Sequence, residues 1–452
     1  MKKQSGVFML VSAVLAGVLF LLPSTGWSAG FAIREQSASA QSSAYAGVSA
    51  GGDDISSIFF NPATMTLYEG INISGQLAWI VPDIELKDAS ASTTFGNPIT
   101  GSTSGNIGPQ ALVPAFYASW QVLPDWFIGL SFNAPFGLTT SADSGWIGRY
   151  HGLGSRLRTY NLEPMIAWKA TPWLSLGGGV QVQYSDARLT SAIDLGTVGT
   201  SNVPPVPGGM PGDPSQDGFA AVEGDDWSYG FSLGVLLTPR NDTRIGIGYR
   251  SAMDVDLEGE AEFGLSAYGE ILSLLSGALQ PTGGSASITL PEMVTLGIKH
   301  DVAPDWTFGA EVAWTRWSRF DRLVVEFDNP SQPDELTLEE WDDGVFVALG
   351  VTYRASDRLR LRTGVAYDQG VVPSPERRTP RIPDSDRYWL SFGAGYDINE
   401  SMTFDAAYTH IFSPDARMNL QASDPGNEAR GNLSGTFTSS ADILNTSLTM
   451  KF

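Results

Sequence analysis

The sequence predicts an all-β fold, a 14-stranded antiparallel transmembrane β-barrel plugged by an N-terminal hatch. Three observations predict this fold class. Many segments alternate apolar and polar residues with a period of two, as strands do when their two faces meet different media. The connections alternate between short turns and long loops rich in Gly, Ser, Pro and Asp, which is the plan of an outer-membrane barrel. One segment near the N-terminus, residues 29–69, does not alternate.

Residues 1–28 have the organisation of a secretory signal peptide. Lys2 and Lys3 supply the positive end, Val7–Leu22 is the apolar run, and a short small-residue exit follows. Cleavage there makes Ala29 the new N-terminus. The alternative is a retained membrane anchor, but the apolar run is short for a helix that needs about 20 residues to span a bilayer. The sequence therefore predicts an exported protein of the outer membrane of a Gram-negative bacterium.

The hatch is predicted from contrast with the rest of the chain. Residues 29–69 are small, polar and rich in Gly, Ala and Ser, and they contain the sequence Asn61-Pro62-Ala63. A segment of this composition, placed between a signal peptide and the first strand, is interpreted as held inside the barrel. Residues 70–452 are then the barrel with its long extracellular loops.

The strands are predicted from alternation. In Leu174–Tyr184, for example, one face carries Leu, Val and Tyr while the other carries Ser, Gly and Gln. Trp126, Trp173 and Trp306 each follow a short turn, where the aromatic girdle of the periplasmic interface is expected. The predicted strands are 70–84, 111–122, 126–138, 157–170, 173–187, 227–238, 243–260, 287–302, 305–327, 341–354, 358–368, 386–398, 401–412 and 442–452.

Pro135 interrupts the third predicted strand, within Asn133-Ala134-Pro135-Phe136-Gly137. Proline cannot donate a hydrogen bond to a neighbouring strand, so a closed wall loses a bond at this position. One interpretation is a kink or a lateral gap in the wall. The other is that Pro135 marks the outer end of the strand, because about 10 residues after Trp126 already span the membrane.

Charged residues of the strands are predicted to face inward. Arg358, Arg360 and Arg362 share one face of their strand, and a charge facing lipid at mid-depth costs about 2–4 kcal/mol. These side chains are interpreted first as part of a salt-bridge network that holds the hatch. The alternative is that one or two arginines bind an anionic head group, for which a guanidinium suits a carboxylate.

The loop after the seventh strand contains an apolar segment, Tyr268–Leu279, that could form a short helix. Ile271, Leu274 and Leu275 would lie on one side of it. An apolar patch on an extracellular loop needs a partner, because large exposed apolar surfaces are unusual. A hydrophobic ligand and packing against the neighbouring long loop are equally compatible with this pattern.

Composition excludes several classes of function. The formal net charge of −22 argues against nucleic acid as a partner. Cysteine is absent, so neither disulfides nor thiolate chemistry are available. The three histidines, His151, His300 and His410, have no spacing for metal ligation or for a nucleophile–base pair. The sequence thus predicts no enzyme, no metal and no cofactor.

The chain resembles the FadL/TodX family of outer-membrane transporters for hydrophobic compounds. The resemblance extends over essentially the whole mature chain, and its combination of motifs is specific although a single piece such as Asn-Pro-Ala is not. The segments that carry it are Asn61–Ala63, Asn133–Leu138, Trp146–His151, Thr315–Asp321 and Arg378–Leu390.

The resemblance implies how such a barrel works. Ligand is expected to land in a groove between the loops 188–226 and 261–286, and then to move to a lumenal pocket beside the mature N-terminus. Exit is expected sideways into the membrane, through a gap beside the kinked third strand. The resemblance assigns roles to three sets of residues: Ala29, Gly30, Phe31, Asn61, Pro62 and Ala63 in the hatch or gate, Asn133, Pro135, Phe136 and Gly137 at the lateral opening, and Ile271, Leu274 and Leu275 in the ligand loop.

The loops depart from those of the fatty-acid members, so Arg188, Arg360 and Arg362 are only candidates for binding a head group. The predicted function is passive, ligand-gated uptake of a hydrophobic molecule by a monomer, with a long-chain fatty acid first and an aliphatic or aromatic hydrocarbon second. The outer-membrane lipid is the other expected partner. The rival functions are a water-filled porin, which predicts no plug, a lipid hydrolase, which needs a nucleophile–His pair, and a structural or adhesive barrel, which would lack the hatch and the loop helix.

Overall fold

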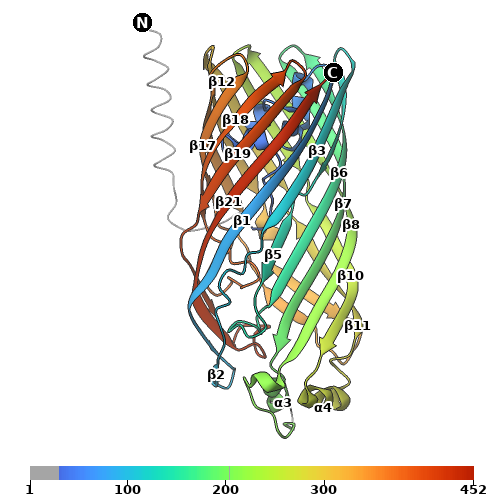
Figure 1. Ribbon diagram of the computed structural model, residues 1–452. Helices are drawn as coiled ribbons and strands as arrows, with labels where there is room; N and C mark the ends of the chain where they lie inside the picture. The colour runs from blue at the N-terminus through green and yellow to red at the C-terminus, as the bar shows by residue number, and fades with distance from the viewer. Residues whose placement is uncertain (1–29, 203) are drawn as a thin grey trace.

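The computed structural model describes residues 30–202 and 204–452, and in this part of the chain a single closed sheet forms a 14-stranded antiparallel barrel (Figure 1). The predicted fold class is therefore confirmed. The predicted signal peptide, residues 1–28, and Ala29 lie outside the described residues. None of the helices described is both long and apolar enough to cross a membrane.

The wall closes where the first strand pairs with the last along almost their whole lengths, between Asn72–Ser92 and Asn432–Lys451. Each strand is otherwise hydrogen-bonded to its neighbours in the chain. In order, the wall consists of β1 (Ile71–Ser92), β3 (Ala111–Leu123), β4 (Trp126–Asn133) with β5 (Gly137–Ser141), β6 (Gly154–Thr171), β7 (Leu174–Ile193), β8 (Gly218–Arg240), β9 (Thr243–Arg250) with β10 (Met253–Gly264), β11 (Thr282–Leu290) with β12 (Met293–Ala303), β13 (Trp306–Thr315) with β14 (Arg322–Phe327), β16 (Gly344–Arg354), β17 (Leu359–Asp368), β18 (Arg387–Asn399), β19 (Met402–Phe412) and β21 (Asn432–Lys451).

Four of the 14 strands are interrupted, and the sequence pointed to an interruption only in the third, as one of two interpretations. The third breaks between β4 and β5 at Pro135, and the eighth breaks between β11 and β12 at Pro291, where a proline has no N–H to donate. The seventh breaks between β9 and β10 at Ser251-Ala252. The ninth breaks between β13 and β14, where the 3₁₀ turn η5 (Trp317–Arg319) interrupts it. Residues of all four breaks line one internal cavity of the barrel, which belongs to the candidate site described below.

The predicted ends at the long-loop side are too short for several strands. The first strand continues to Ser92 instead of 84, and the last begins at Asn432 instead of 442. Beyond the lipid both faces of a strand meet water or protein, so the alternation that predicts a strand disappears although the hydrogen-bonded ladder continues. The loops there carry further short elements: β2 (Pro98–Ile99), α3 (Leu195–Ser201), η4 (Pro214–Gln216), α4 (Ala267–Ser276), β15 (Glu335–Leu338) and β20 (Ala416–Leu420).

The outer face of the wall carries an apolar band, and aromatic residues lie at both edges of this band. At the short-turn end, the indoles of Trp126 and Trp168 stack with ring centroids 5.6 Å apart. At the other edge of the band, the rings of Phe132 and Tyr160 stack in the same way, 6.3 Å apart. Large apolar side chains on the outside of the barrel match a lipid environment. Outer-membrane barrels place their short turns in the periplasm and their long loops outside the cell.

Residues 30–70 lie inside the barrel, as the blue segment of Figure 1 shows. They form short elements only: α2 (Ala38–Gln41), η1 (Val48–Ala50), η2 (Ile55–Phe59) and η3 (Pro62–Leu67). Asn61 caps η3, because its Oδ1 accepts from the N–H of Ala63 and its Nδ2 donates to Ser49 O and Val235 O. The same side chain thus ties the turn both to the hatch and to the wall.

Glycines allow the backbone of this inner segment to touch the wall. A Cβ at Gly246 or Gly364 would overlap the carbonyl oxygen of Ser49 or Ser43. Several of these glycines are direct neighbours across adjacent strands, including the run Gly309, Gly350 and Gly364. The inward-facing glycines whose added Cβ would come closer than 3.0 Å to residues 42–65 are Gly129, Gly177, Gly234, Gly246, Gly248, Gly309, Gly350, Gly364 and Gly393. We call this set the glycine ring.

Ion pairs hold the periplasmic side of the inner segment. The guanidinium of Arg362 donates to Asp405 on the wall at 2.8 Å and also to Asp53 of the inner segment. Glu311 accepts hydrogen bonds from the N–H and the hydroxyl of Ser49. The inner segment is therefore held both by the backbone contacts at the glycine ring and by these buried polar pairs.

Candidate functional site

An almost entirely apolar cavity of about 100 Å³ lies in the lumen, on the long-loop side of the inner segment. The ring of Phe31 closes its lower end. Strands β6, β7, β8, β10 and β11 form one side, and the segment around β14 forms the other. Its apolar lining includes Phe31, Leu138, Leu157, Leu189, Val222, Leu257, Ile288, Phe320, Leu323, Val325 and Ile382.

Phe31 sits in an aromatic cluster built from the breaks in the third and ninth strands and from the segment before β16. Its ring lies edge-on to Trp317, with centroids 4.7 Å apart, and also contacts Phe136, Phe320 and Trp341 at 5.7–6.2 Å. Phe31 is almost fully buried as a result. Edge-to-face aromatic pairs each add about 0.5–1.5 kcal/mol to the burial of the rings. The cluster therefore seats the beginning of the described chain firmly between the cavity and the wall.

The N-terminal segment pairs with the break in the third strand. The N–H of Ile33 donates to Pro135 O at 2.8 Å, and the N–H of Gly137 donates to Phe31 O at 2.9 Å. The side-chain amide of Gln36 donates to Ala134 O at 2.7 Å. Backbone groups that the kink removes from the wall are thus satisfied by the segment itself. The segment and the kink form one hydrogen-bonded unit.

A second, larger cavity of about 850 Å³ passes into the wall beside this kink. On its inner side it reaches Phe31 and Glu35. On its outer side it reaches lipid-facing residues, among them Leu77, Leu112 and Tyr160. Because β5 pairs only with β6, the wall has an interruption between β1 and β3 on one side and β5 and β6 on the other. Pro135 therefore interrupts the wall instead of marking the end of the strand.

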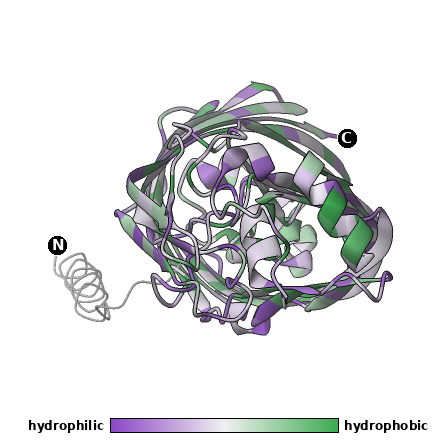
Figure 2. Ribbon diagram, turned by 90° about the horizontal axis from the view of Figure 1, so that it is seen from below, coloured by the Kyte–Doolittle hydropathy of each residue, from purple (hydrophilic) through white to green (hydrophobic). Residues whose placement is uncertain are grey.

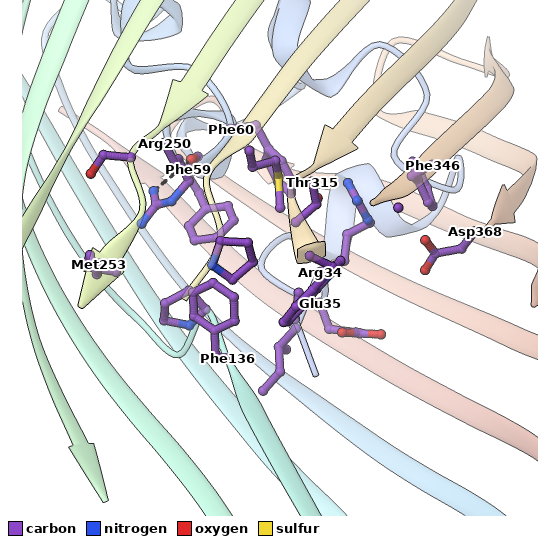
Figure 3. Close-up of a pocket in the computed structure, with 18 of the residues that line it drawn as sticks. Arg34, Glu35, Phe59, Phe60, Phe136, Arg250, Met253, Thr315, Phe346 and Asp368 are labelled. Carbon is purple, nitrogen blue, oxygen red and sulfur yellow. Dashed lines mark hydrogen bonds between the residues drawn. The ribbon is translucent and has the colours of Figure 1, made fainter. Parts of the chain in front are cut away.

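A third, smaller cavity of about 50 Å³ lies beneath the segment and carries charged groups (Figure 3). The guanidinium of Arg34 lies 3.8 Å above the ring of Phe346, and Arg250 lies 4.4 Å above the ring of Phe59. Arg250 also donates to Glu163 at 2.9 Å. Glu35 and Asp368 supply the facing carboxyl groups. This chamber thus combines aromatic side chains with charged groups.

Two buried carboxyl groups of the extracellular loops support the segment. Asp384 accepts from Arg387 at 2.9 Å and from the N–H of Gly30 at 3.4 Å, and burial raises the pKa of its carboxyl to about 7. Glu339 accepts from the indole N–H of Trp341 at 2.9 Å, and burial raises its pKa to about 8. Both groups lie directly behind the seat of Phe31.

The three arginines predicted as head-group candidates lie apart from one another and outside the lining of the two larger cavities. Arg362 is buried below the inner segment with Asp53 and Asp405. Arg360 pairs with Asp397 at 2.6 Å near the periplasmic end. Arg188 is partly exposed at the extracellular side, 3.7 Å from Glu223. The geometry matches the predicted salt-bridge network for Arg362, and a head-group role for any of the three stays an untested prediction.

The predicted loop helix exists as α4, capped by Ser266, whose side chain accepts from Gly269 N. It packs through Leu272, which is buried, and leaves Ile271, Leu274 and Leu275 exposed, with Leu274 85% accessible. Figure 2 shows α4 as a strongly apolar helix at the long-loop end of the barrel. Within residues 30–202 and 204–452, no group of three or more His, Cys, Asp or Glu side chains is placed to hold a metal ion.

Sequence reasoning did not identify the seat of Phe31. Trp317 and Phe320 belong to a motif that carries the family resemblance, yet no role was predicted for either. Trp341 was placed at the start of a strand, whereas it precedes β16 and points inward against Phe31. The available signal was that Trp317 and Phe320 within the predicted strand 305–327, together with Trp341 at the start of the next, are too many large rings for all of them to face lipid.

Comparison with known proteins agrees with this architecture. A family model described as outer membrane protein transport protein (OMPP1/FadL/TodX) matches residues 19–452. The long-chain fatty acid transport protein of Escherichia coli K12 is 29% identical over 430 residues, which cover 91% of this chain and 94% of the relative. A putative outer membrane protein of Neisseria meningitidis serogroup B is 30% identical over 460 residues, covering 98% of each.

Solved structures show the same fold. A Pseudomonas aeruginosa FadL homologue superimposes with a TM-score of 0.85 at 25% identity, covering 94% of this chain and 100% of the homologue. The Pseudomonas putida toluene transporter TodX superimposes with a TM-score of 0.69 at 20% identity, covering 93% and 99%. With its 14-stranded barrel and the family match over nearly the whole sequence, the chain belongs to the OMPP1/FadL/TodX family of outer-membrane transporters for hydrophobic compounds.

Proposed function

We propose that this protein takes up long-chain fatty acids by ligand-gated passive diffusion and releases them sideways into the membrane. The single observation that carries the proposal is the position of Phe31. Its ring separates the apolar cavity from the cavity that passes through the wall, and it belongs to a segment held by the kink at Pro135. A ligand that displaces this ring would connect the two cavities.

The path follows from what each part of the lumen offers. The exposed apolar residues of α4 are a first contact for a hydrophobic molecule, and the apolar cavity is the next. The direct route through the barrel to the short-turn end is blocked by residues 37–70, because the glycine ring places this segment directly against the wall. The remaining way out is the cavity beside β5, which reaches lipid-facing side chains. In this proposal Asn61, Pro62 and Ala63 anchor the hatch, and Gly30 and Phe31 move.

The fatty-acid assignment rests on the curated relatives, whose names refer to long-chain fatty acids. The lining of this cavity, which is apolar apart from Ser155, Arg156, Glu223 and Ser285, equally suits a hydrocarbon, which is the second candidate. A panel of fatty acids, alkanes and alkylbenzenes, tested for binding and for support of growth, separates the two. The monomeric state and the membrane lipid as acceptor are part of the same proposal.

Replacing Pro135-Phe136-Gly137 with a regular strand sequence tests lateral release. A continuous strand would pair with both neighbours and close the gap, so uptake of oleate should fall to background while binding of oleate to purified protein persists. In the matched control, the same strand-forming tripeptide replaces residues 421–423 of an extracellular loop, and residues 135–137 keep their wild-type sequence. Normal uptake by the closed-strand variant would contradict lateral release at this site.

A further inference from the structure

One arginine lies on the outer side of the wall opening and has no partner in the structure. Arg158 of β6 is exposed and lines the cavity that passes through the wall. It stands directly opposite Gly137, the first residue after the kink, in the pairing of β5 with β6. Among the residues described, its guanidinium makes no hydrogen bond and no ion pair.

Its two neighbours of the same charge are already engaged. Arg156, two residues away on the same face, donates to both oxygens of Asp186 at 3.1 Å. Arg188 on β7 pairs with Glu223. Asp186 is the residue opposite Arg158 in the pairing of β6 with β7, but its carboxylate is turned to Arg156. Arg158 is therefore left with free donors that point away from the protein interior.

The height of Arg158 in the membrane follows from the strand geometry. Trp168 marks the periplasmic girdle on the same face of β6, and the outward residues between the two are apolar or aromatic up to Tyr160. About ten residues separate Trp168 from Arg158. At about 3.3 Å each and a tilt of about 45°, they rise roughly 23 Å, close to the apolar band of about 25 Å. Arg158 thus lies in the head-group layer of the outer leaflet.

These positions suit the head group of an amphiphile. A molecule whose tail lies in the wall cavity, between Leu112 and Tyr160, would hold its polar end at the level where the apolar band stops. A guanidinium forms charge-assisted, bidentate hydrogen bonds with a carboxylate. A pure hydrocarbon would gain nothing from Arg158 at this point.

We propose that Arg158 binds the carboxylate of the ligand as it leaves through the wall, and that the protein therefore selects anionic amphiphiles over hydrocarbons at its exit. This inference rests on the proposed uptake function and names the substrate class of the same route. Arg158 acts here as a specificity residue outside the lumen. The sequence around it carries no signal beyond alternation.

The test measures initial uptake of radiolabelled oleate and of hexadecane by cells of a Gram-negative host that lacks its own fatty-acid channel. The variants are Arg158→Gln and Arg158→Lys, and Lys87→Gln is the matched control. Lys87 is an exposed cation of β1 that pairs with Glu85 and does not line the cavity. We expect R158Q to slow oleate uptake about fivefold, the size of one exposed charge-assisted contact. R158K should fall between R158Q and wild type, because an ammonium keeps the charge but not the bidentate geometry. Hexadecane uptake should be unchanged in all variants.

The outcomes separate the inference from the proposed function. Wild-type cells that take up no oleate would contradict both. Oleate uptake by the wild type with R158Q equal to K87Q would contradict the role of Arg158 alone. An equal loss of oleate and hexadecane uptake in R158Q would show a structural effect and would also contradict it. The amount of each variant in the outer membrane is measured in the same cells.

Discussion

The ring of Phe31 lies edge-on against the indole of Trp317, with the two ring centroids 4.7 Å apart and their planes at 69°. These residues are far apart in the sequence, and their contact joins the start of the described chain to the break between β13 and β14. Phe31 itself lines both the apolar cavity and the cavity that passes into the wall. Several consequences of this arrangement can be measured.

Removing the ring of Phe31 should release the N-terminal segment. Phe31→Ala deletes a buried aromatic side chain, a change that costs about 3–5 kcal/mol in a packed core. The chain contains no cysteine, so a single Ala32→Cys substitution gives a unique label site. We expect maleimide labelling of Cys at this position to accelerate at least about tenfold in F31A, following the lost packing free energy. Phe95→Ala, which removes an exposed ring, is the control and should leave the labelling rate unchanged.

A side chain in the glycine ring should dislodge the hatch. At Gly246 an added Cβ would overlap Ser49 O, so Gly246→Val must displace backbone on one side or the other. We expect a higher single-channel conductance in planar bilayers, or loss of assembled protein from the membrane. Gly75→Val is the matched control, because Gly75 lies in a strand with no atom within 4 Å of its added Cβ. Equal behaviour of the two variants would contradict backbone packing at the ring.

The ion pairs below the hatch should contribute to its retention. Arg362→Met leaves Asp53 and Asp405 without their shared guanidinium, and breaking a buried pair costs about 3–5 kcal/mol. We expect residues 42–60 to exchange their amide hydrogens faster while the wall strands keep wild-type rates. Arg322→Met, which removes an exposed cation paired with Asp321, serves as the control. Unchanged exchange in R362M would mean that the glycine contacts alone hold the hatch.

The loop behind Phe31 should become less stable as the pH rises. Burial raises the pKa of Glu339 to about 8 from an ordinary value of 4.5, so the folded loop favours the protonated carboxyl. A raised carboxyl pKa means that the folded state binds more protons than the open one, and stability is lost between pH 4.5 and 8. At pH 8 we expect Glu339→Gln to slow amide exchange of residues 335–345 relative to wild type. At pH 4 the two proteins should match, and a difference that persists there would contradict this explanation.

Alternation predicted the strands wherever lipid and lumen impose different chemistry on the two faces. In β7 it identified Leu174–Tyr184 correctly, but the strand continues to Ile193, beyond the lipid, where the pattern no longer applies. The break at Pro135 was predictable because the residue itself cannot donate a hydrogen bond. The break at Ser251 was not, since nothing in its local sequence opposes a strand.

The candidate site was predicted only in part, because much of it depends on contacts between distant segments that local sequence does not reveal. The resemblance placed Phe31 and Pro135 at the gate and the opening, and the structure joins them through backbone hydrogen bonds. The partner Trp317 comes from the break in the ninth strand and Trp341 from the segment before β16, so their meeting with Phe31 is a property of the closed barrel. Arg158 was not singled out from the sequence, because its importance depends on the opening beside it, which only the closed barrel shows.

The glycine ring also restricts the order in which the molecule can be assembled. Nine strand positions, from Gly129 to Gly393, lie against one inner segment, most of them against its backbone. Such contacts leave no clearance for threading residues 42–65 into a finished cylinder. The long seam between β1 and β21 must therefore form after the segment has been enclosed, or together with its enclosure. During biogenesis the hatch then serves as the template around which the last strand completes the barrel.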